Sequence, residues 1–247
     1  MAVVAQAPVQ RSKKTQPLIV RITHWVNAVA MVIMIGSGWR IFNDSPLIPG
    51  FIFHPDITLG GDVYLSQQMW QDSGMGGALQ WHFAGMWLLV LNGLVYLVFG
   101  IASGHFRHGL WVSARELRNI PHSIWEHIRL RFPKGDEARH YNVLQKLTYL
   151  VVMFIVIPVM VLTGMTMSPG LNARFPFLVE LFGGRQTART IHFILAFGLV
   201  AFAFIHVALV ILSGFANNMR SMITGRFVIA SKQRELHEHE PAHPSSS

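Results

Sequence analysis

The sequence predicts an all-α integral membrane protein, folded as a bundle of four transmembrane helices. Of the 247 residues, 51% are hydrophobic and only 13% are charged, about half the charged share of a typical soluble domain. The chain also contains four separate apolar runs, and a membrane core needs about 20 apolar residues per helix. Because backbone polar groups inside lipid must be satisfied within their own segment, we expect these runs to be helices.

Each apolar run is assigned to one span, and no other stretch of the sequence is long and apolar enough to add a fifth. The predicted spans cover about residues 20–39, 79–101, 143–167 and 190–213. Residues 18–227 form the predicted four-helix membrane domain, preceded by a flexible cytoplasmic lead over 1–17. Residues 228–247 are rich in His, Glu, Pro and Ser, which predicts a disordered cytoplasmic tail. Pro158 is expected to kink the third span.

The distribution of basic residues predicts the orientation of the bundle. Lys and Arg concentrate before the first span, in the segment 104–142 and after the fourth span. The segment 43–78 contains none, and 168–188 contains only two. The positive-inside rule therefore places both termini and 104–142 in the cytoplasm. Cleavage of the first span as a signal peptide would spoil this alternation, so we prefer an uncleaved span.

Charge and cysteine content exclude several other classes of protein. The net charge of +8 could suggest nucleic acid, but the basic residues lie at the ends of apolar runs, so no nucleic-acid partner is expected. The chain has no cysteine, which excludes disulfides, Cys-ligated iron–sulfur clusters and covalently attached c-type haem. A redox centre must use other ligands, and 13 histidines are available.

A short helix is expected on the inner membrane surface, between the second and third spans. Leu117, Ile120, Ile124 and Ile128 recur at helical spacing among Arg and His residues, a pattern typical of an interfacial helix. An ordinary amphipathic helix packed on the protein explains the pattern equally well. Pro121 is expected to bend or divide this helix.

Four histidines lie inside the predicted spans, where ionisable side chains are costly and need a reason. By topology, His24 and His206 lie toward the cytoplasmic side, whereas His82 and His192 lie toward the outer side. The 14 residues between His192 and His206 correspond to about 21 Å along a helix and to within about 40° of one face. One helix can therefore offer a ligand to each of two stacked sites in a core about 30 Å thick.

These two depth-matched pairs predict two stacked b-type haems, each iron held by two imidazoles. We assign His24 and His206 to an inner haem, and His82 and His192 to an outer haem. Two imidazoles fill both axial positions of the iron, which suits electron transfer. A lone histidine in a membrane is more often a proton relay or a packing residue, so the prediction depends on the pairing.

Other polar residues near these histidines are candidates for supporting roles. Arg21 and Arg189 each lie three residues before a paired histidine, and Arg40 lies at the outer end of the first span. We hypothesise that these arginines bind haem propionates or support the ligands, although interfacial anchoring explains them equally well. A quinone site is hypothesised near the inner haem. Its candidate residues are Asn27, Asn142 and Lys146, which solvated helix ends explain as well.

Several residue strings around the histidines match a known pattern. They are Arg21-Ile-Thr-His24-Trp25 at the start of the first span, Trp81-His82 at the start of the second, and the spacing from His192 to His206. On these residues the chain resembles the bacterial dihaem cytochrome b subunits of nickel–iron hydrogenases, formate dehydrogenases and thiosulfate reductases, over about residues 18–227. Further stretches are similar to the thiosulfate-reductase-like cytochrome b group. They cover residues 131–135, 141–146, 162–169, 182–186 and 222–226.

The resemblance implies a respiratory-chain subunit that transfers electrons between quinone or quinol and a partner enzyme. Its relatives dock a catalytic oxidoreductase on the outer face, which implies a periplasmic, molybdopterin-containing partner besides membrane lipid. This chain would then be the electron-transfer subunit and not the catalytic one. The alternatives are a stand-alone haem oxidoreductase acting on a small species such as superoxide, and a haem-free transporter with histidine relays. No inverted repeat supports the transporter.

Overall fold

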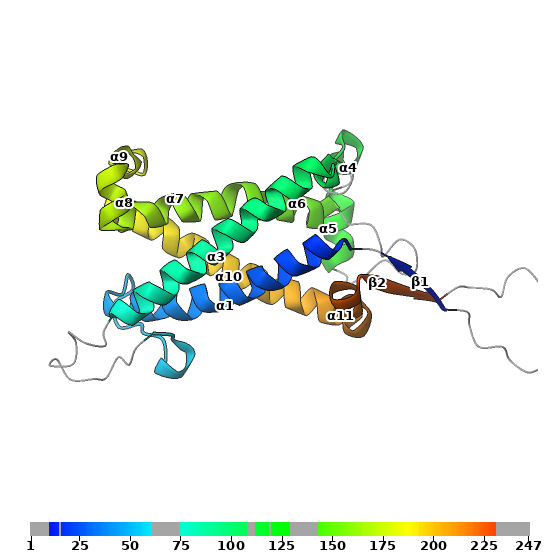
Figure 1. The fold of residues 1–247 in the computed structure, drawn as a ribbon, viewed down its shortest axis with the longest axis horizontal. Helices are drawn as coiled ribbons and strands as arrows, with labels where there is room; N and C mark the ends of the chain where they lie inside the picture. The colour runs from blue at the N-terminus through cyan, green and yellow to red at the C-terminus, as the bar shows by residue number, and fades with distance from the viewer. Residues whose placement is uncertain are drawn as a thin grey trace, which may run out of the picture.

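Four long helical segments run side by side along the long axis of the molecule (Figure 1). The computed structural model describes residues 10–14, 16–60, 75–107, 112–118, 120–128 and 143–230. The long segments are α1 (Leu18–Asp44), α3 (Met75–Ala102), a third span over Val143–Met167, and α10 (Arg185–Leu212). All four have the length and composition of membrane spans, which confirms the predicted bundle. Only 6–11% of the most apolar stretch of each helix is buried within the protein, so most of these apolar residues are left to contact lipid or a bound group.

The third span is the only one of the four whose helix changes type along its length. It consists of α6 (Val143–Val151), a π-helical turn η4 (Val152–Val156) and α7 (Ile157–Met167). Pro158 has no backbone N–H, and its ring crowds the carbonyl four residues earlier, which belongs to Phe154 within η4. The disturbance predicted at Pro158 therefore appears as a widened turn directly before the proline.

The helices pack as two hairpins, α1 with α3 and α7 with α10. In the first hairpin, the Asn92 side chain donates to the Thr23 carbonyl at 2.8 Å and to the Asn27 side-chain oxygen at 2.7 Å. A Cβ on Gly85 would lie 3.0 Å from side-chain atoms of Ile33 and Met34, so the missing side chain allows α1 and α3 to approach closely.

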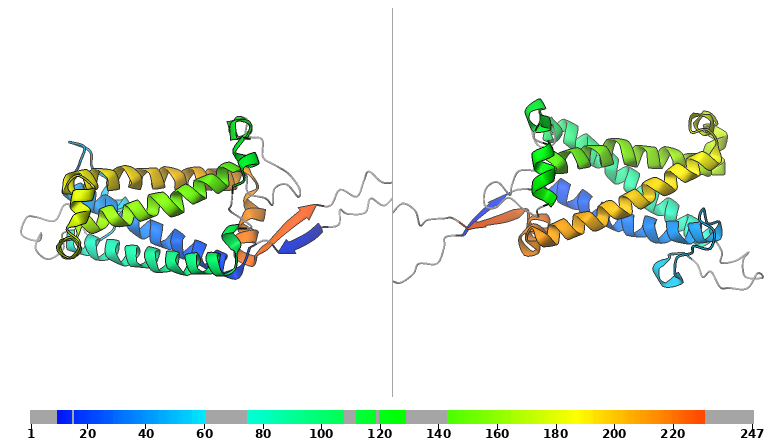
Figure 2. Two further views of the ribbon diagram at one scale, coloured as in Figure 1. Left: turned by 90° about the horizontal axis from the view of Figure 1, so that it is seen from above. Right: turned by 180° about the vertical axis from the view of Figure 1, so that it is seen from behind.

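The shorter elements gather at the two ends of the bundle (Figures 1 and 2). One end carries α4 (Ala114–Arg118), α5 (Ile120–Ile128), α11 (Phe215–Thr224) and the strands β1 (Gln10–Lys14) and β2 (Arg226–Ala230). The opposite end carries η1 (Pro55–Ile57), α8 (Pro169–Arg174) and α9 (Phe177–Leu181). Both ends of the described chain thus lie at the end that the basic residues predict to be cytoplasmic.

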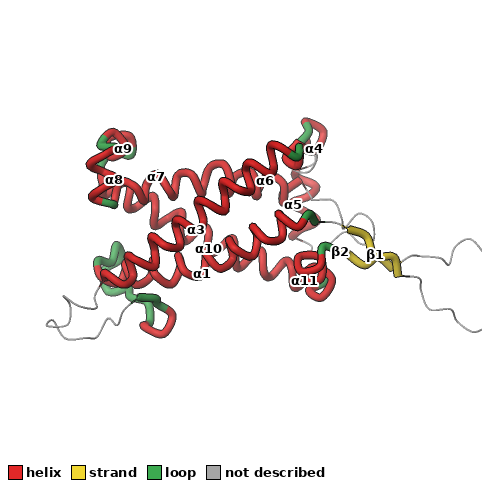
Figure 3. The backbone as a smooth tube through the Cα atoms, in the orientation of Figure 1, coloured by secondary structure: helices red, strands yellow, loops and turns green. Residues whose placement is uncertain are grey.

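The two strands correct the prediction for the chain's ends. β1 pairs with β2 in antiparallel register, from Gln10 opposite Ala230 to Lys14 opposite Arg226. This small sheet is shown in yellow in Figure 3 and extends beyond the helices. Residues 10–14 of the predicted lead and 228–230 of the predicted tail thus belong to paired strands, and the flexibility of the remaining lead and tail stays a prediction. Hydrogen bonds between distant backbones form this sheet, and no local periodicity indicates it.

The predicted short helix in the inner segment is present as two pieces, with α4 ending at Arg118 and α5 beginning at Ile120. Pro121 stands in the first turn of α5, where its missing N–H breaks no helical hydrogen bond. α5 packs on α6. α4 begins with a capping box, in which the Ser113 backbone N–H donates to Glu116 Oε2 at 2.8 Å and the Glu116 N–H donates to Ser113 Oγ at 3.3 Å.

Glu116 also joins this helix to the third span. Its Oε1 accepts a 2.7 Å hydrogen bond from the Lys146 ammonium. This bond, helped by the bonds from Ser113, lowers the pKa of Glu116 from 4.5 to about 2. The contact therefore stabilises the fold fully above pH 4.5, and the stabilisation is lost as the pH falls toward 2.

We expect Glu116→Gln to lower the melting temperature at pH 7 and to have little effect near pH 2. The variant lacks the carboxylate that accepts from Lys146, so the difference from the unmodified protein should shrink as the pH falls from 4.5. Thermal unfolding of both proteins over this range measures that difference. Glu180→Gln, at an exposed position of α9, is the control. A difference that is independent of pH would contradict this role for Glu116.

The segment after α1 folds back onto the outer end of the bundle. The Asn43 side chain donates to the Phe53 carbonyl and accepts from the Phe53 N–H, both at 2.8 Å. The Leu59 N–H donates to the Gly36 carbonyl at 3.0 Å. Aromatic rings extend this contact across to α10. The stacked pairs are Trp39 with Phe53 at 4.7 Å and Phe42 with Phe193 at 5.2 Å, and Phe193 lies 4.6 Å from Phe197.

Candidate functional site

The four intramembrane histidines face one another as two pairs between the hairpins. His82 of α3 and His192 of α10 have ring centres 6.3 Å apart, with ring planes at 58°. His24 of α1 and His206 of α10 have ring centres 6.1 Å apart, with planes at 59°. The structure therefore brings together the same two pairs of histidines that the predicted depths give. α10 contributes one member to each pair.

The ring separations fit one metal ion between the two rings of each pair. A metal–imidazole bond is about 2.0–2.1 Å and a ring nitrogen lies about 1.1 Å from its ring centre, so two axial imidazoles have centres about 6.2–6.4 Å apart. The observed 6.1 and 6.3 Å agree with this geometry. Among the described residues, no third His, Cys, Asp or Glu joins either pair. A bare metal ion would lack ligands there, whereas a porphyrin supplies the remaining four nitrogens.

In the outer pair, both imidazoles contact a buried hydroxyl group. Ser37 Oγ lies 3.0 Å from His82 Nδ1, and Thr163 Oγ1 lies 3.1 Å from His192 Nδ1. Both hydroxyl residues have no exposed surface. Each hydroxyl also donates to the backbone carbonyl four residues earlier on its own helix, Ser37 to Ile33 at 2.6 Å and Thr163 to Val159 at 2.7 Å.

These contacts determine which ring nitrogen of each outer histidine carries the proton. His192 Nδ1 also lies 3.0 Å from the Met160 carbonyl. A carbonyl only accepts, and the Ser37 hydroxyl beside His82 Nδ1 gives its own proton to the Ile33 carbonyl, so Nδ1 is the protonated nitrogen in both rings. The Nε2 lone pair of each ring is then available to a metal, which is the usual arrangement for a ligating histidine.

The inner pair has a different environment. Among the described residues, the His24 and His206 side chains make ring contacts but no hydrogen bond. Trp25 lies 5.4 Å from the His24 ring in an edge contact, and Phe202 lies 6.0 Å from the His206 ring, one turn earlier on α10. The inner rings are therefore positioned by packing, whereas the outer rings are positioned by packing and hydrogen bonds.

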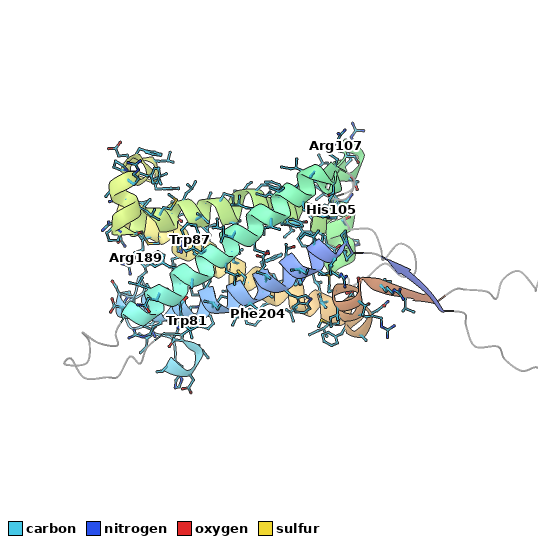
Figure 4. All side chains as sticks on the ribbon, viewed as in Figure 1. Trp81, Trp87, His105, Arg107, Arg189 and Phe204 are labelled. Carbon is cyan, nitrogen blue, oxygen red and sulfur yellow. The ribbon has the colours of Figure 1, made fainter. Side chains whose placement is uncertain are left out.

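The three candidate arginines lie at the ends of the spans. Arg21 donates to the Ile223 carbonyl at the end of α11, and Trp25 Nε1 donates to the neighbouring Met222 carbonyl at 3.2 Å. Arg189, labelled at the outer end in Figure 4, donates to the Ser45 carbonyl after α1. Arg40 is buried, with 5% of its surface exposed. Arg21 and Arg189 thus link the helix turns before His24 and His192 to neighbouring segments, and their propionate role stays a prediction.

Two of the three candidate quinone residues lie in the described part of the chain, and each has a side-chain partner of its own. The side-chain oxygen of Asn27 accepts from Asn92, and Lys146 is paired with Glu116. Asn142 lies outside the described residues. Another titratable side chain at this end, His105, lies 6.0 Å from the Phe99 ring and is labelled in Figure 4. Burial lowers the pKa of His105 below 6.5, so its imidazole is neutral at pH 7.

Ser37 and Thr163 are site residues that the sequence analysis missed. Small hydroxyl residues inside spans usually support helix packing, so neither residue indicates a site by itself. The sequence does contain a shared pattern, because each hydroxyl residue directly precedes a glycine, Gly38 or Gly164, near the outer level of its span. The two dipeptides come from α1 and α7, the helices that pack against α3 with His82 and α10 with His192.

Two comparisons relate this chain to known proteins. The family model described as prokaryotic cytochrome b561 matches residues 15–225. The putative protein-methionine-sulfoxide reductase subunit YedZ1 of Azospira oryzae is 43% identical over 196 residues, which cover 79% of this chain and 89% of that protein. No solved structure matches the chain.

Proposed function

This chain belongs to the prokaryotic cytochrome b561 family, and from that premise we propose that it carries electrons through two bis-histidine haems. The family and the four apolar spans establish a membrane b-type cytochrome that transfers electrons. The observation that carries the finer proposal is the opposition of two histidine pairs at 6.1 and 6.3 Å, both including α10. His24 and His206 would hold the inner haem, and His82 and His192 the outer haem.

The protein's own residues would hold the two haems at different depths. When bound, the haems supply one-electron chemistry at iron, and the protein supplies the axial imidazoles and an apolar surround. Two imidazoles would hold each iron, so the protein would leave no coordination position there for a small molecule. This arrangement supports electron transfer over the alternative of an enzyme that binds a small species at the metal.

We propose that electrons pass between a quinone near the inner haem and a catalytic subunit at the outer end. The orientation follows from the basic residues, which place both termini on the cytoplasmic side of a bacterial inner membrane. The outer end carries the folded segment 45–60 with α8 and α9, which is a suitable surface for a docked subunit. The quinone, its site and this orientation are all proposals.

The proposed partner is a protein-methionine-sulfoxide reductase. The Azospira oryzae relative is named as a subunit of such an enzyme, and its similarity covers most of both chains. The earlier expectation of a molybdopterin-containing partner is kept as part of this proposal, and it rests on the resemblance alone. Membership of the thiosulfate-reductase-like group remains a prediction.

Haem stoichiometry tests the proposal most directly. We expect purified protein to contain two b-type haems per chain in a pyridine haemochrome assay, with reduced spectra typical of low-spin iron. When a quinol is supplied, the same protein should pass electrons to a co-purified reductase. The loss of methionine sulfoxide measures this transfer. Correctly folded protein without haem would overturn the dihaem assignment. A dihaem protein that reduces no sulfoxide reductase would overturn the partner only.

A further inference from the structure

We propose that Ser37 and Thr163 are positioning residues for the outer haem, which lower its reduction potential by hydrogen bonding to its two ligands. The inference rests on the proposed dihaem function and concerns the histidines through which these hydroxyls would act. Neither hydroxyl would touch the haem. The argument depends on how the two hydroxyls are placed, on the direction of their hydrogen bonds, and on the difference between the two histidine pairs.

The two hydroxyls occupy equivalent places in the two hairpins. In the first hairpin, α1 provides Ser37 and α3 provides His82. In the second hairpin, α7 provides Thr163 and α10 provides His192. The outer site is thus assembled from two matched halves, each with a hydroxyl on one helix and an imidazole on the next.

The resemblance between the halves extends to the residues around each hydroxyl. The residue three positions earlier is a methionine in both cases, Met34 or Met160, and the Met160 carbonyl also lies 3.0 Å from His192 Nδ1. The residue one position later is a glycine. A Cβ on Gly38 would lie 3.5 Å from His82 Cε1, and a Cβ on Gly164 would lie 3.4 Å from His192 Cε1. Each hydroxyl helix therefore approaches its imidazole along the same side of the ring.

The direction of each hydrogen bond follows from the partners. The Ser37 and Thr163 hydroxyl protons are directed to the carbonyls of Ile33 and Val159, at 2.6 and 2.7 Å. Each hydroxyl oxygen is then left to accept from an imidazole Nδ1–H. The bonds therefore run in one direction, from imidazole to hydroxyl to backbone carbonyl. An acceptor at Nδ1–H makes the opposite nitrogen a stronger donor to a metal and orients the ring.

A stronger imidazole donor stabilises ferric over ferrous iron, so these bonds lower the potential of the outer haem. The inner histidines lack this support among the described residues, because their rings make ring contacts without hydrogen bonds. The two haems would thus have the same kind of ligand but different reduction potentials, because in the described part of the chain only the outer ligands have hydrogen-bond acceptors. Removing the hydroxyls should affect the outer haem and leave the inner one unchanged.

The test is a redox titration of the purified full-length protein with Ser37→Ala, Thr163→Val or both. We expect both haems to be retained and the midpoint potential of the outer haem to rise. A three- to tenfold loss of ferric preference per hydroxyl corresponds to about 30–60 mV for a one-electron couple. The outer haem is identified as the one that His82→Ala removes. Its low-spin electron paramagnetic resonance signal should also shift, because each imidazole loses one of the contacts that orient its ring.

Two further variants separate positioning from general packing. Thr163→Ser keeps the hydroxyl and should retain the original potential. Thr166→Val removes another fully buried hydroxyl of α7, which donates to the Thr163 carbonyl at 2.7 Å, and should leave both potentials unchanged. An outer potential and signal that stay the same in the double variant would overturn the inference, as would equal shifts of both haems. Absence of haem from the unmodified protein would instead overturn the proposed function.

Discussion

Replacing one histidine of a pair by alanine is expected to remove one haem of two and to leave the other in place. His82→Ala and His192→Ala should lose the outer haem, whereas His24→Ala and His206→Ala should lose the inner haem. A haem with one protein ligand in a lipid-facing bundle would lose a large part of its binding energy. Electron transfer from quinol to the partner should fall at least a hundredfold in all four variants, because either loss interrupts the route.

The double variants make this prediction sharper than the single ones. His82→Ala with His192→Ala should match the single outer variants, because both residues serve one haem. His82→Ala with His206→Ala should contain no haem. Pyridine haemochrome assays and low-temperature spectra of the purified proteins measure both results. His54→Ala, at an exposed position after the first span, is the control and should keep two haems. Full haem content in His82→Ala would refute the outer assignment.

The second large effect is expected at Gly60, where the segment after α1 touches the start of α3. Gly60 has φ +97°, and a Cβ there would lie 2.5 Å from the Ala78 backbone. An alanine would adopt a backbone conformation that costs about 1–2 kcal/mol for side-chain-bearing residues. It would also overlap a helix backbone, and overpacking typically costs about 1–3 kcal/mol. We therefore expect Gly60→Ala to destabilise the protein by about 2–5 kcal/mol.

Gly50 provides the matched control for this effect. It has φ +76°, and nothing lies within 4 Å of the position that its Cβ would occupy. Gly50→Ala should therefore cost only the backbone term, about 1–2 kcal/mol. Thermal unfolding in lipid nanodiscs, followed by tryptophan fluorescence and by haem absorbance, compares the two variants. Because α3 also carries His82, the outer haem should be lost first in Gly60→Ala. Equal melting temperatures for the two variants would contradict the prediction, because the chain would then have moved to relieve the overlap with the Ala78 backbone.

The features that the sequence predicts here are those with a periodic or cumulative signal. Hydropathy summed over 20 residues locates the spans, and the structure extends the first from 20–39 to Leu18–Asp44. The histidine pairing follows from the predicted topology and the axial rise, because the end at which a span begins and the rise per residue together fix how deep each residue lies. For the same reason His24 with His206, and His82 with His192, could be paired without any knowledge of how the hairpins pack.

The features that the sequence does not predict depend on contacts between distant segments. β1 and β2 are five-residue strands separated by more than 200 residues, and only their backbone atoms join them. The hydrogen bonds of Ser37 and Thr163 require the ring orientation of a histidine on another helix. Asn142, a candidate quinone residue, lies outside the described residues, so its role is still a prediction. Local propensity carries no information about such pairings.

The contrast between α10 and the third span has a consequence for electron tunnelling. Tunnelling rates fall steeply with the distance between two redox centres, so fluctuations in that distance would make transfer uneven. α10 is unbroken over Arg185–Leu212 and carries a ligand for each proposed centre, so one stiff rod sets their spacing. The π-helical turn and Pro158 lie in the span without ligands, and bending can occur there without separating the two centres. In the proposed dihaem arrangement, a bend at this turn would leave the spacing set by α10 unchanged.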